Sequence, residues 1–236
     1  MTFAAGPSFR PRVALISATT SAIAPAAVAF AEEFPEARLW NVLDDRLLAD
    51  AEDSAGVTPE LVRRMERLIE YAVDGGAEGI LLTCSQYGFL SRIMNTPVPV
   101  EAPDDASFAD VLTRGFRSVL IVASLRSTLD DTLARLEAAA ALAGTRLHLD
   151  GICEPNAVTF LAAGKSAQLA SELAAAIRGR ARRADAVLLA QYSLAPTAEI
   201  LQTIIGRPVL SGPVSAARRL RARLLDLAEA AEGATT

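Results

Sequence analysis

Apolar, strand-like runs alternate with helical patterns along this chain, and the order of these segments occurs twice. One apolar run ends in Ser17, and a later one ends in Ser124. The run that begins at Ala77 (AEGILLTC) matches the run that begins at Ala184 (ADAVLLAQ), and these two runs are spaced exactly as far apart in the sequence as the two serines. A constant offset over much of the chain predicts an internal repeat, with each copy built of βαβ units.

Short apolar runs separated by helices are typical of parallel sheets that are covered on both faces. We therefore predict an α/β fold class with two pseudo-symmetric, flavodoxin-like parallel-sheet lobes and an active site in the cleft between them. The first lobe is expected to comprise residues 12–101 plus 213–230, and the second residues 104–211. The expected strands are 12–17, 38–42, 79–83, 97–101, 118–124, 146–150, 186–190 and 208–210. The expected helices are 22–33, 58–74, 128–143, 156–163, 166–182, 195–205 and 214–229.

Several residue types are scarce, and this scarcity excludes whole classes of chemistry. The chain has one histidine (His148), one lysine (Lys165) and two cysteines (Cys84 and Cys153). A histidine-rich metal site is impossible, a Ser-His-Asp triad would depend on His148, and pyridoxal chemistry would depend on Lys165. We therefore expect neither a metal nor a cofactor.

Charge and cysteine content indicate the compartment and the partners. A net charge of -5 and 5% aromatic residues offer no electrostatic footprint for nucleic acid. Two cysteines make no disulfide framework, which favours a reducing cytoplasm, and the arginine-rich, lysine-poor composition indicates a bacterial source. The apolar stretch 13–31 imitates a signal peptide, but Thr19 to Ser21 and Pro25 interrupt it, so we predict a cytoplasmic protein with no membrane partner.

Polar residues stand where the repeated strands end. Ligands of parallel open sheets bind beyond the carboxyl ends of the strands. Ser17, Cys84, Ser124 and Gln191 occupy such ends, and the offset of the repeat places Cys84 opposite Gln191. These positions are the candidate site.

The turn Thr83-Cys84-Ser85 after one strand, the turn Gln191-Tyr192-Ser193 after its twin, and the two-copy layout resemble the aspartate/glutamate/hydantoin racemase superfamily. This superfamily includes cofactor-independent racemases, a maleate isomerase and an arylmalonate decarboxylase. The resemblance implies a catalytic thiol at Cys84 and a second thiol in the other half, where this chain has Gln191. Racemisation by two thiols would therefore lack one of them, whereas decarboxylation or cis-trans isomerisation needs only one.

The candidate catalytic residues are Cys84, as general acid/base or nucleophile, and Tyr192, as an alternative proton donor. The residues expected to contact the substrate are Ser17, Thr19, Thr83, Ser85, Gln86, Ser124, Ser127, Thr128, Gln191 and Ser193. A helix that begins shortly after Cys84 would supply a dipole and free amides to the thiol.

Each candidate also has a structural interpretation. Cys84 can be a buried structural cysteine, and Gln191 can cap a strand end. Ser21 and Ser127 or Thr128 can cap helices instead of binding a carboxylate. Asp104 and Asp105 can begin a helix rather than line a cleft.

Two functional hypotheses remain. The first is a cofactor-independent enzyme that transfers a proton at the carbon α to a carboxylate. The second is a non-catalytic, two-lobed binding protein or sensor for a small carboxylate. Both imply a small carboxylate or amino-acid-like ligand, and apolar outer helices permit a homodimer.

Overall fold

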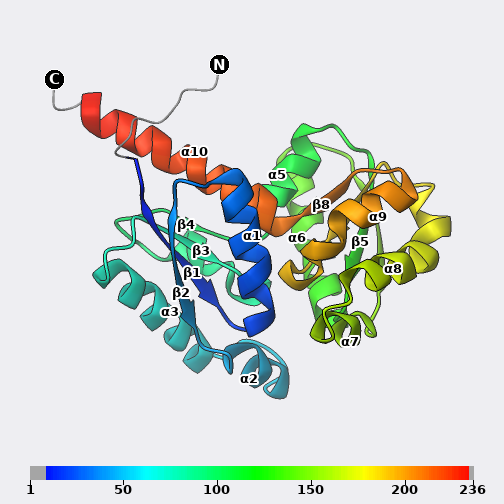
Figure 1. Ribbon diagram of the computed structural model, residues 1–236, viewed down its shortest axis with the longest axis horizontal. Helices are drawn as coiled ribbons and strands as arrows, with labels where there is room; N and C mark the ends of the chain where they lie inside the picture. The colour runs from blue at the N-terminus through cyan, green and yellow to red at the C-terminus, as the bar shows by residue number, and fades with distance from the viewer. Residues whose placement is uncertain (1–8, 234–236) are drawn as a thin grey trace. The chain divides into compact units, whose positions relative to one another are not determined.

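The computed structural model describes residues 9–233, which divide into two compact units (Figure 1). The first unit includes the described residues up to Pro103 and those from Ala216 on, and the second is Asp104–Ser215. Each unit is built on a four-stranded parallel sheet, with strand order β2-β1-β3-β4 in the first and β6-β5-β7-β8 in the second. The predicted α/β class with two parallel-sheet lobes is confirmed.

The first unit follows the predicted alternation of strands and helices. Its strands are β1 (Arg12–Ser17), β2 (Arg38–Leu43), β3 (Gly79–Leu82) and β4 (Val100–Glu101). Its helices are η1 (Thr20–Ala22), α1 (Ile23–Glu33), α2 (Leu47–Asp53), α3 (Pro59–Asp74), η2 (Ser85–Tyr87) and α4 (Leu90–Ile93), with α10 (Gly212–Gly233) from Ala216 on.

The second unit repeats this order. Its strands are β5 (Ser118–Ala123), β6 (His148–Cys153), β7 (Ala186–Leu189) and β8 (Val209–Ser211). Its helices are α5 (Asp105–Thr113), α6 (Arg126–Leu142), α7 (Ala157–Ala162), α8 (Ser166–Ala181), η3 (Tyr192–Thr197) and α9 (Ala198–Ile205).

The central strands are apolar because helices cover both faces of each sheet. In the first unit, Ile16 and Leu82 pack with Met65 and Ile69 of α3 in one buried cluster. On the opposite face α10 approaches closely, since a Cβ added at Gly79 would lie 3.0 Å from Leu224 Cδ1. Burial on both faces explains why these strands are continuous hydrophobic runs rather than alternating ones.

In each unit an acidic residue just before the third strand accepts hydrogen bonds from backbone amides at the amino-terminal edge of the sheet. Glu78 Oε2 accepts a hydrogen bond from the Arg12 amide at 2.8 Å. Asp185 Oδ2 accepts hydrogen bonds from the amides of Arg117 and Ser118 at 2.8 and 3.0 Å, and these bonds lower the pKa of Asp185. Glu78 and Asp185 are related by the offset predicted for the third strands. Carboxylate-to-amide hydrogen bonds at equivalent positions therefore support the internal repeat.

Helix α3 begins as its sequence predicts. Thr58 is the N-cap, its hydroxyl accepts a hydrogen bond from the Leu61 amide at 3.3 Å, and Pro59 is the first helical residue. Gly75 follows the last turn. This agreement reflects strong local signals at both ends of the helix.

Other boundaries were predicted wrongly. The expected strand 97–101 is reduced to Val100–Glu101, since Pro97 and Pro99 lack the amide hydrogen that a strand ladder needs. The expected strand 146–150 lies at His148–Cys153, because pairing with the full length of β5 extends it through Asp150 and Gly151. Helices α2 and α4 were not predicted.

Candidate functional site

Two buried hydroxyl groups meet at the carboxyl edge of the first sheet. The Thr83 amide donates to the Ile16 carbonyl at 3.0 Å, which continues the pairing of β3 with β1 by one residue. This contact lets Thr83 Oγ1 donate a hydrogen bond to Ser17 Oγ at 2.9 Å. Both side chains are buried. The structure therefore brings two of the predicted site residues together, directly before Cys84.

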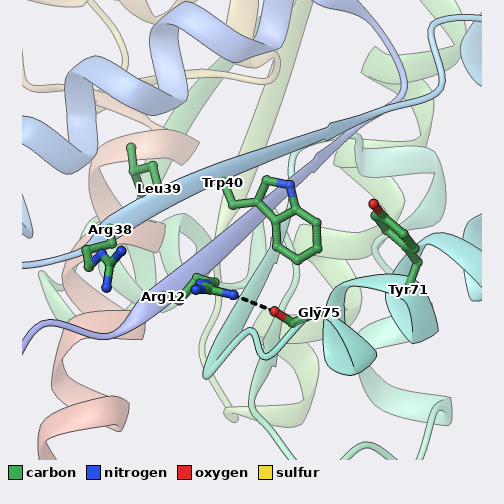
Figure 2. A pocket seen from close by; sticks show the side chains of 6 residues that line it. All are labelled: Arg12, Arg38, Leu39, Trp40, Tyr71 and Gly75. Atoms are coloured by element: carbon green, nitrogen blue, oxygen red, sulfur yellow. Dashed lines mark hydrogen bonds between the residues drawn. The ribbon is translucent and has the colours of Figure 1, made fainter.

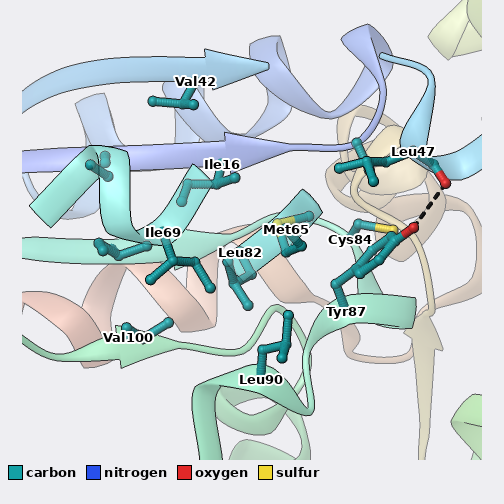
Figure 3. Packing of buried hydrophobic residues seen from close by; sticks show 14 of the residues in the cluster. Ile16, Val42, Leu47, Met65, Ile69, Leu82, Cys84, Tyr87, Leu90 and Val100 are labelled. Carbon is teal, nitrogen blue, oxygen red and sulfur yellow. Dashed lines mark hydrogen bonds between the residues drawn. The ribbon is translucent and has the colours of Figure 1, made fainter. Parts of the chain in front are cut away.

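Cys84 is the second residue beyond β3, and 8% of its surface is exposed. Its side chain packs in the apolar cluster that also contains Leu47, Tyr87 and Leu90 (Figure 3). Neither Cys84 nor Cys153 is in a disulfide. The helix expected after Cys84 is the three-residue 3₁₀ turn η2, so its dipole is much smaller than that of a full α-helix.

Tyr87 is a buried neighbour of Cys84 in this cluster. Its hydroxyl donates a hydrogen bond to the Leu47 carbonyl at 2.9 Å (Figure 3). Burial raises the pKa of Tyr87 to about 12, and the charge of an ionised Cys84 acts in the same direction. Tyr87 is therefore a neutral hydrogen-bond donor at neutral pH, and it orders the segment around the thiol.

A charged group stands at the same edge of the first unit, and the sequence reasoning missed it. The Asp44 amide, just after β2, donates to the Ser17 carbonyl at 3.1 Å. Arg64 of α3 donates to Asp44 at 2.6 Å and to Asp50 at 2.7 Å. Hydrogen bonds to both carboxylates raise the pKa of Arg64. The signal in the sequence was the position of Asp44, two residues beyond the predicted strand 38–42.

Gln86, two residues after Cys84, contributes a buried acceptor. Its Oε1 atom is buried and accepts no hydrogen bond from the described part of the chain. A buried amide oxygen without a donor is costly and uncommon, so such a group calls for an explanation. An N–H or O–H group of a bound ligand would satisfy it.

The loops after β1 and β5 differ from the predicted helix caps. Thr19 Oγ1 and Ser21 Oγ lie 3.2 Å apart, and Ser21 lies inside η1 rather than at an N-cap. Helix α6 begins at Arg126, with Leu125 as its N-cap and no capping side chain. Ser127 and Thr128 therefore lie within the first turn of α6, beyond the position that the capping interpretation requires. That interpretation was wrong at both helices.

At the carboxyl edge of the second sheet, Gln191 is bonded to Ser124. Gln191 Oε1 accepts hydrogen bonds from the Ser124 amide at 2.6 Å and from the Ser124 hydroxyl at 2.9 Å. Its amide oxygen thus caps the end of β5. This arrangement matches the structural interpretation of Gln191 as a strand-end cap.

The strand register corrects the predicted equivalence of Ser17 and Ser124. Val13 pairs with Gly79 in the first unit, whereas Val119 pairs with Ala186 in the second. The offset between the first strands is therefore shorter by one position than the offset between the third strands, so Ser17 corresponds to Ala123. Cys84 still corresponds to Gln191, because each is the second residue beyond its third strand.

The remaining candidates of the second unit lie in or beside η3 and β6. Tyr192 is buried as the first residue of η3, and Ser193, next to it, is half-buried. Cys153 is the last residue of β6, where it pairs with Ala123, and it is also half-buried. By this register Cys153 corresponds to Leu43 and not to Cys84.

The acidic residues at the end of β4 and shortly after it have structural partners. Glu101 is almost fully buried and forms ion pairs with Arg219 at 3.0 Å and Arg223 at 3.4 Å, both on α10. In the second unit, Asp104 forms an ion pair with Arg135 at 2.7 Å, and Asp105 begins α5 as predicted.

Comparison with solved structures identifies the same fold in racemases. Picrophilus torridus aspartate racemase superposes with a TM-score of 0.70 at 15% identity, covering 91% of this chain and 94% of that chain. Allantoin racemase from Klebsiella pneumoniae superposes with a TM-score of 0.65 at 18% identity, covering 92% of this chain and 89% of that chain. The Gly74Cys mutant of arylmalonate decarboxylase superposes with a TM-score of 0.56 at 18% identity, covering 90% of this chain and 94% of that chain.

This chain has the fold of the Asp/Glu racemase superfamily. The resemblance predicted from the sequence is confirmed at that level. No protein-family model and no curated protein sequence matches the chain. Within residues 9–233, no group of three His, Cys, Asp or Glu residues is placed to hold a metal ion. No helix in that range is long and apolar enough to cross a bilayer.

We expect Tyr87 to make stability depend on pH under alkaline conditions. Its pKa is about 12 in the folded state and about 10 in an unfolded chain, so its stabilising contribution is complete below about pH 10 and is lost as the pH rises toward 12. The advantage of the wild type over Tyr87→Phe should therefore shrink by up to about 1.4 kcal/mol per pH unit above about pH 10. Urea denaturation of both proteins at several pH values measures this difference, and a constant difference would refute the assignment.

Proposed function

We propose that the protein is a cofactor-independent enzyme that transfers a proton at the carbon α to a carboxylate, with Cys84 as the reacting group. The observation that carries this proposal is the position of Cys84 in the chain, at the carboxyl end of the first sheet and directly after Thr83, whose hydroxyl is hydrogen-bonded to that of Ser17. Structural likeness to racemases and to a decarboxylase supports this class of chemistry.

The hydroxyl pair fits the binding of a carboxylate. Oriented O–H and N–H donors stabilise the negative charge that develops on a carboxylate when the neighbouring carbon loses a proton or carbon dioxide. Within the first unit, Ser17, Thr19, Thr83 and Ser85 offer hydroxyl groups around the same strand ends. The buried Gln86 oxygen is suited to accept a hydrogen bond from the amino or hydroxyl group of a substrate.

Gln191 favours a one-thiol reaction over racemisation by two thiols. An amide cannot take up or deliver a proton at neutral pH, and the Gln191 oxygen is already bonded to Ser124. In decarboxylation, the bond from the α carbon to one carboxylate breaks, carbon dioxide leaves, and the electron pair forms an enediolate. The Cys84 thiol then donates its proton to the α carbon, and water restores the thiol. Tyr192 remains a candidate for a second proton donor.

A small carboxylate-binding protein or sensor is the second candidate function. It is favoured by the burial of Cys84 among apolar side chains and by the engagement of Gln191 with Ser124. Such a protein would bind a carboxylate tightly and leave it unchanged.

The decisive experiment is an NMR assay in D₂O with amino acids, hydantoins, malonates and maleate. We expect one of these compounds to exchange its α proton, isomerise or lose carbon dioxide. Cys84→Ala should lower the rate at least about 10²-fold, because a positioned acid/base contributes that much. Cys153→Ala is the matched control and should retain the wild-type rate.

The same assay separates the alternatives. Equal turnover by wild type and Cys84→Ala would exclude Cys84 as the reacting group. Binding of the same carboxylates is measured by the rise in thermal denaturation temperature. Saturable binding without any turnover would favour the sensor.

A second thiol, introduced at position 191, should add α-proton exchange or racemisation to the reactions of the protein. If the amide at position 191 is what prevents two-sided proton transfer, Gln191→Cys should gain exchange or racemisation of an α proton. Gln191→Ala is the control, because it also frees Ser124 but adds no thiol. Equal exchange rates in the two variants, measured by NMR in D₂O and by chiral chromatography, would contradict this explanation.

A further inference from the structure

The first unit has a groove at the amino-terminal edge of its sheet, at the opposite ends of the strands from Cys84. Its volume is about 430 Å³, and Figure 2 shows its lining. Six residues from β1, β2 and the end of α3 line it: Arg12, Arg38, Leu39, Trp40, Tyr71 and Gly75. The proposed function uses none of these residues.

Two arginines stand side by side in this groove. Arg12 and Arg38 are register partners on adjacent parallel strands. Neither guanidinium lies within 4.0 Å of a carboxylate anywhere in residues 9–233. The Arg12 side chain donates to the Gly75 carbonyl at 2.6 Å, which orients it without neutralising its charge. Like charges directly opposite each other destabilise a sheet, so this pair favours a bound anion.

An aromatic wall adjoins the two charges. Trp40 lies two residues beyond Arg38 on β2, so both side chains project from the same face of the sheet. The ring centroids of Trp40 and Tyr71 are 5.4 Å apart, and the two ring planes are inclined by 56°. Gly75 makes room for the indole, since a Cβ there would lie 2.3 Å from Trp40 Cη2. Trp40 packs against the edge of the buried cluster, whereas Tyr71 is 61% exposed, so packing in the core does not account for the tyrosine.

The repeat shows that the fold does not require these residues. By the strand register, the second unit has Ser118 and His148 where the first has the two arginines. Asp150 takes the place of Trp40, and it forms an ion pair with Arg180 at 3.2 Å. The paired arginines and the aromatic wall are therefore specific to the first unit.

We propose that this groove is a binding site for an aromatic carboxylate. The guanidinium groups of Arg12 and Arg38 bind the carboxylate oxygens, and the ring of the ligand packs against Trp40 and Tyr71. Arginine is well suited to planar recognition of carboxylates, and aromatic pairs add to the affinity beyond the area that they bury. A few polar groups beside an aromatic surface are typical of small-molecule sites.

Tryptophan fluorescence tests the proposal directly, because Trp40 is the only tryptophan of the chain. Titration with benzoate should change the emission saturably. Benzamide, which lacks the charge, and cyclohexanecarboxylate, which lacks the aromatic ring, should each bind at least about tenfold more weakly, the factor that corresponds to about 1.4 kcal/mol.

Variants identify the site. Arg38→Gln should weaken benzoate binding at least about tenfold, a loss of about 1.4 kcal/mol. Arg183→Gln removes the same charge from the exposed surface of the second unit and should bind like the wild type. Cys84→Ser should also bind like the wild type, because the groove is separate from the proposed reacting group. The proposal is overturned if benzoate gives no saturable change, or if Arg38→Gln and Arg183→Gln bind it equally.

Discussion

The parallel pairing of β1 with β3 is the constraint on which the candidate site depends. It aligns Ile16 with Leu82, so that Ser17 and Thr83 meet where the two strands end. Cys84 then follows without an intervening residue, and the turn η2 carries Gln86 and Tyr87 close behind it. Because both strands are buried on both faces, this register cannot slip without moving apolar side chains out of the core. The stability of the sheet thereby fixes the position of the thiol.

The second unit has the same strand pairing but different residues at the strand ends. Its third strand ends at the corresponding place, but Gln191 stands where the first unit has Cys84, and its amide oxygen is bonded to Ser124. One copy of the repeat thus presents a thiol at its strand end, whereas the other presents a capped amide. A similar divergence separates the opposite edges, where Arg12 and Arg38 have Ser118 and His148 as counterparts. The common fold is kept by the apolar strands, while the residues at their ends vary.

Sequence reasoning succeeded where local signals were strong. Thr58 and Pro59 marked the start of α3, and the apolar runs marked the buried strands. It failed where tertiary pairing overrides local preference. Strand β6 continues to Cys153 because β5 pairs with it throughout, and the constant offset expected for the repeat concealed a shift of one position between the first strands. The position of Asp44 after a strand could be read from the sequence, but its ion pair with Arg64 could not, because that pair joins residues far apart in the chain.

The central claim is that Cys84 reacts beside a carboxylate-binding group, and alkylation rates test it most directly. Iodoacetate carries a carboxylate and iodoacetamide does not, while Cys153 reports the intrinsic preference of a thiol in the same protein. Peptide mass spectrometry gives the rate of each reagent at each cysteine. The account predicts that the ratio of the iodoacetate rate to the iodoacetamide rate is higher at Cys84 than at Cys153. Equal ratios at the two cysteines would contradict it.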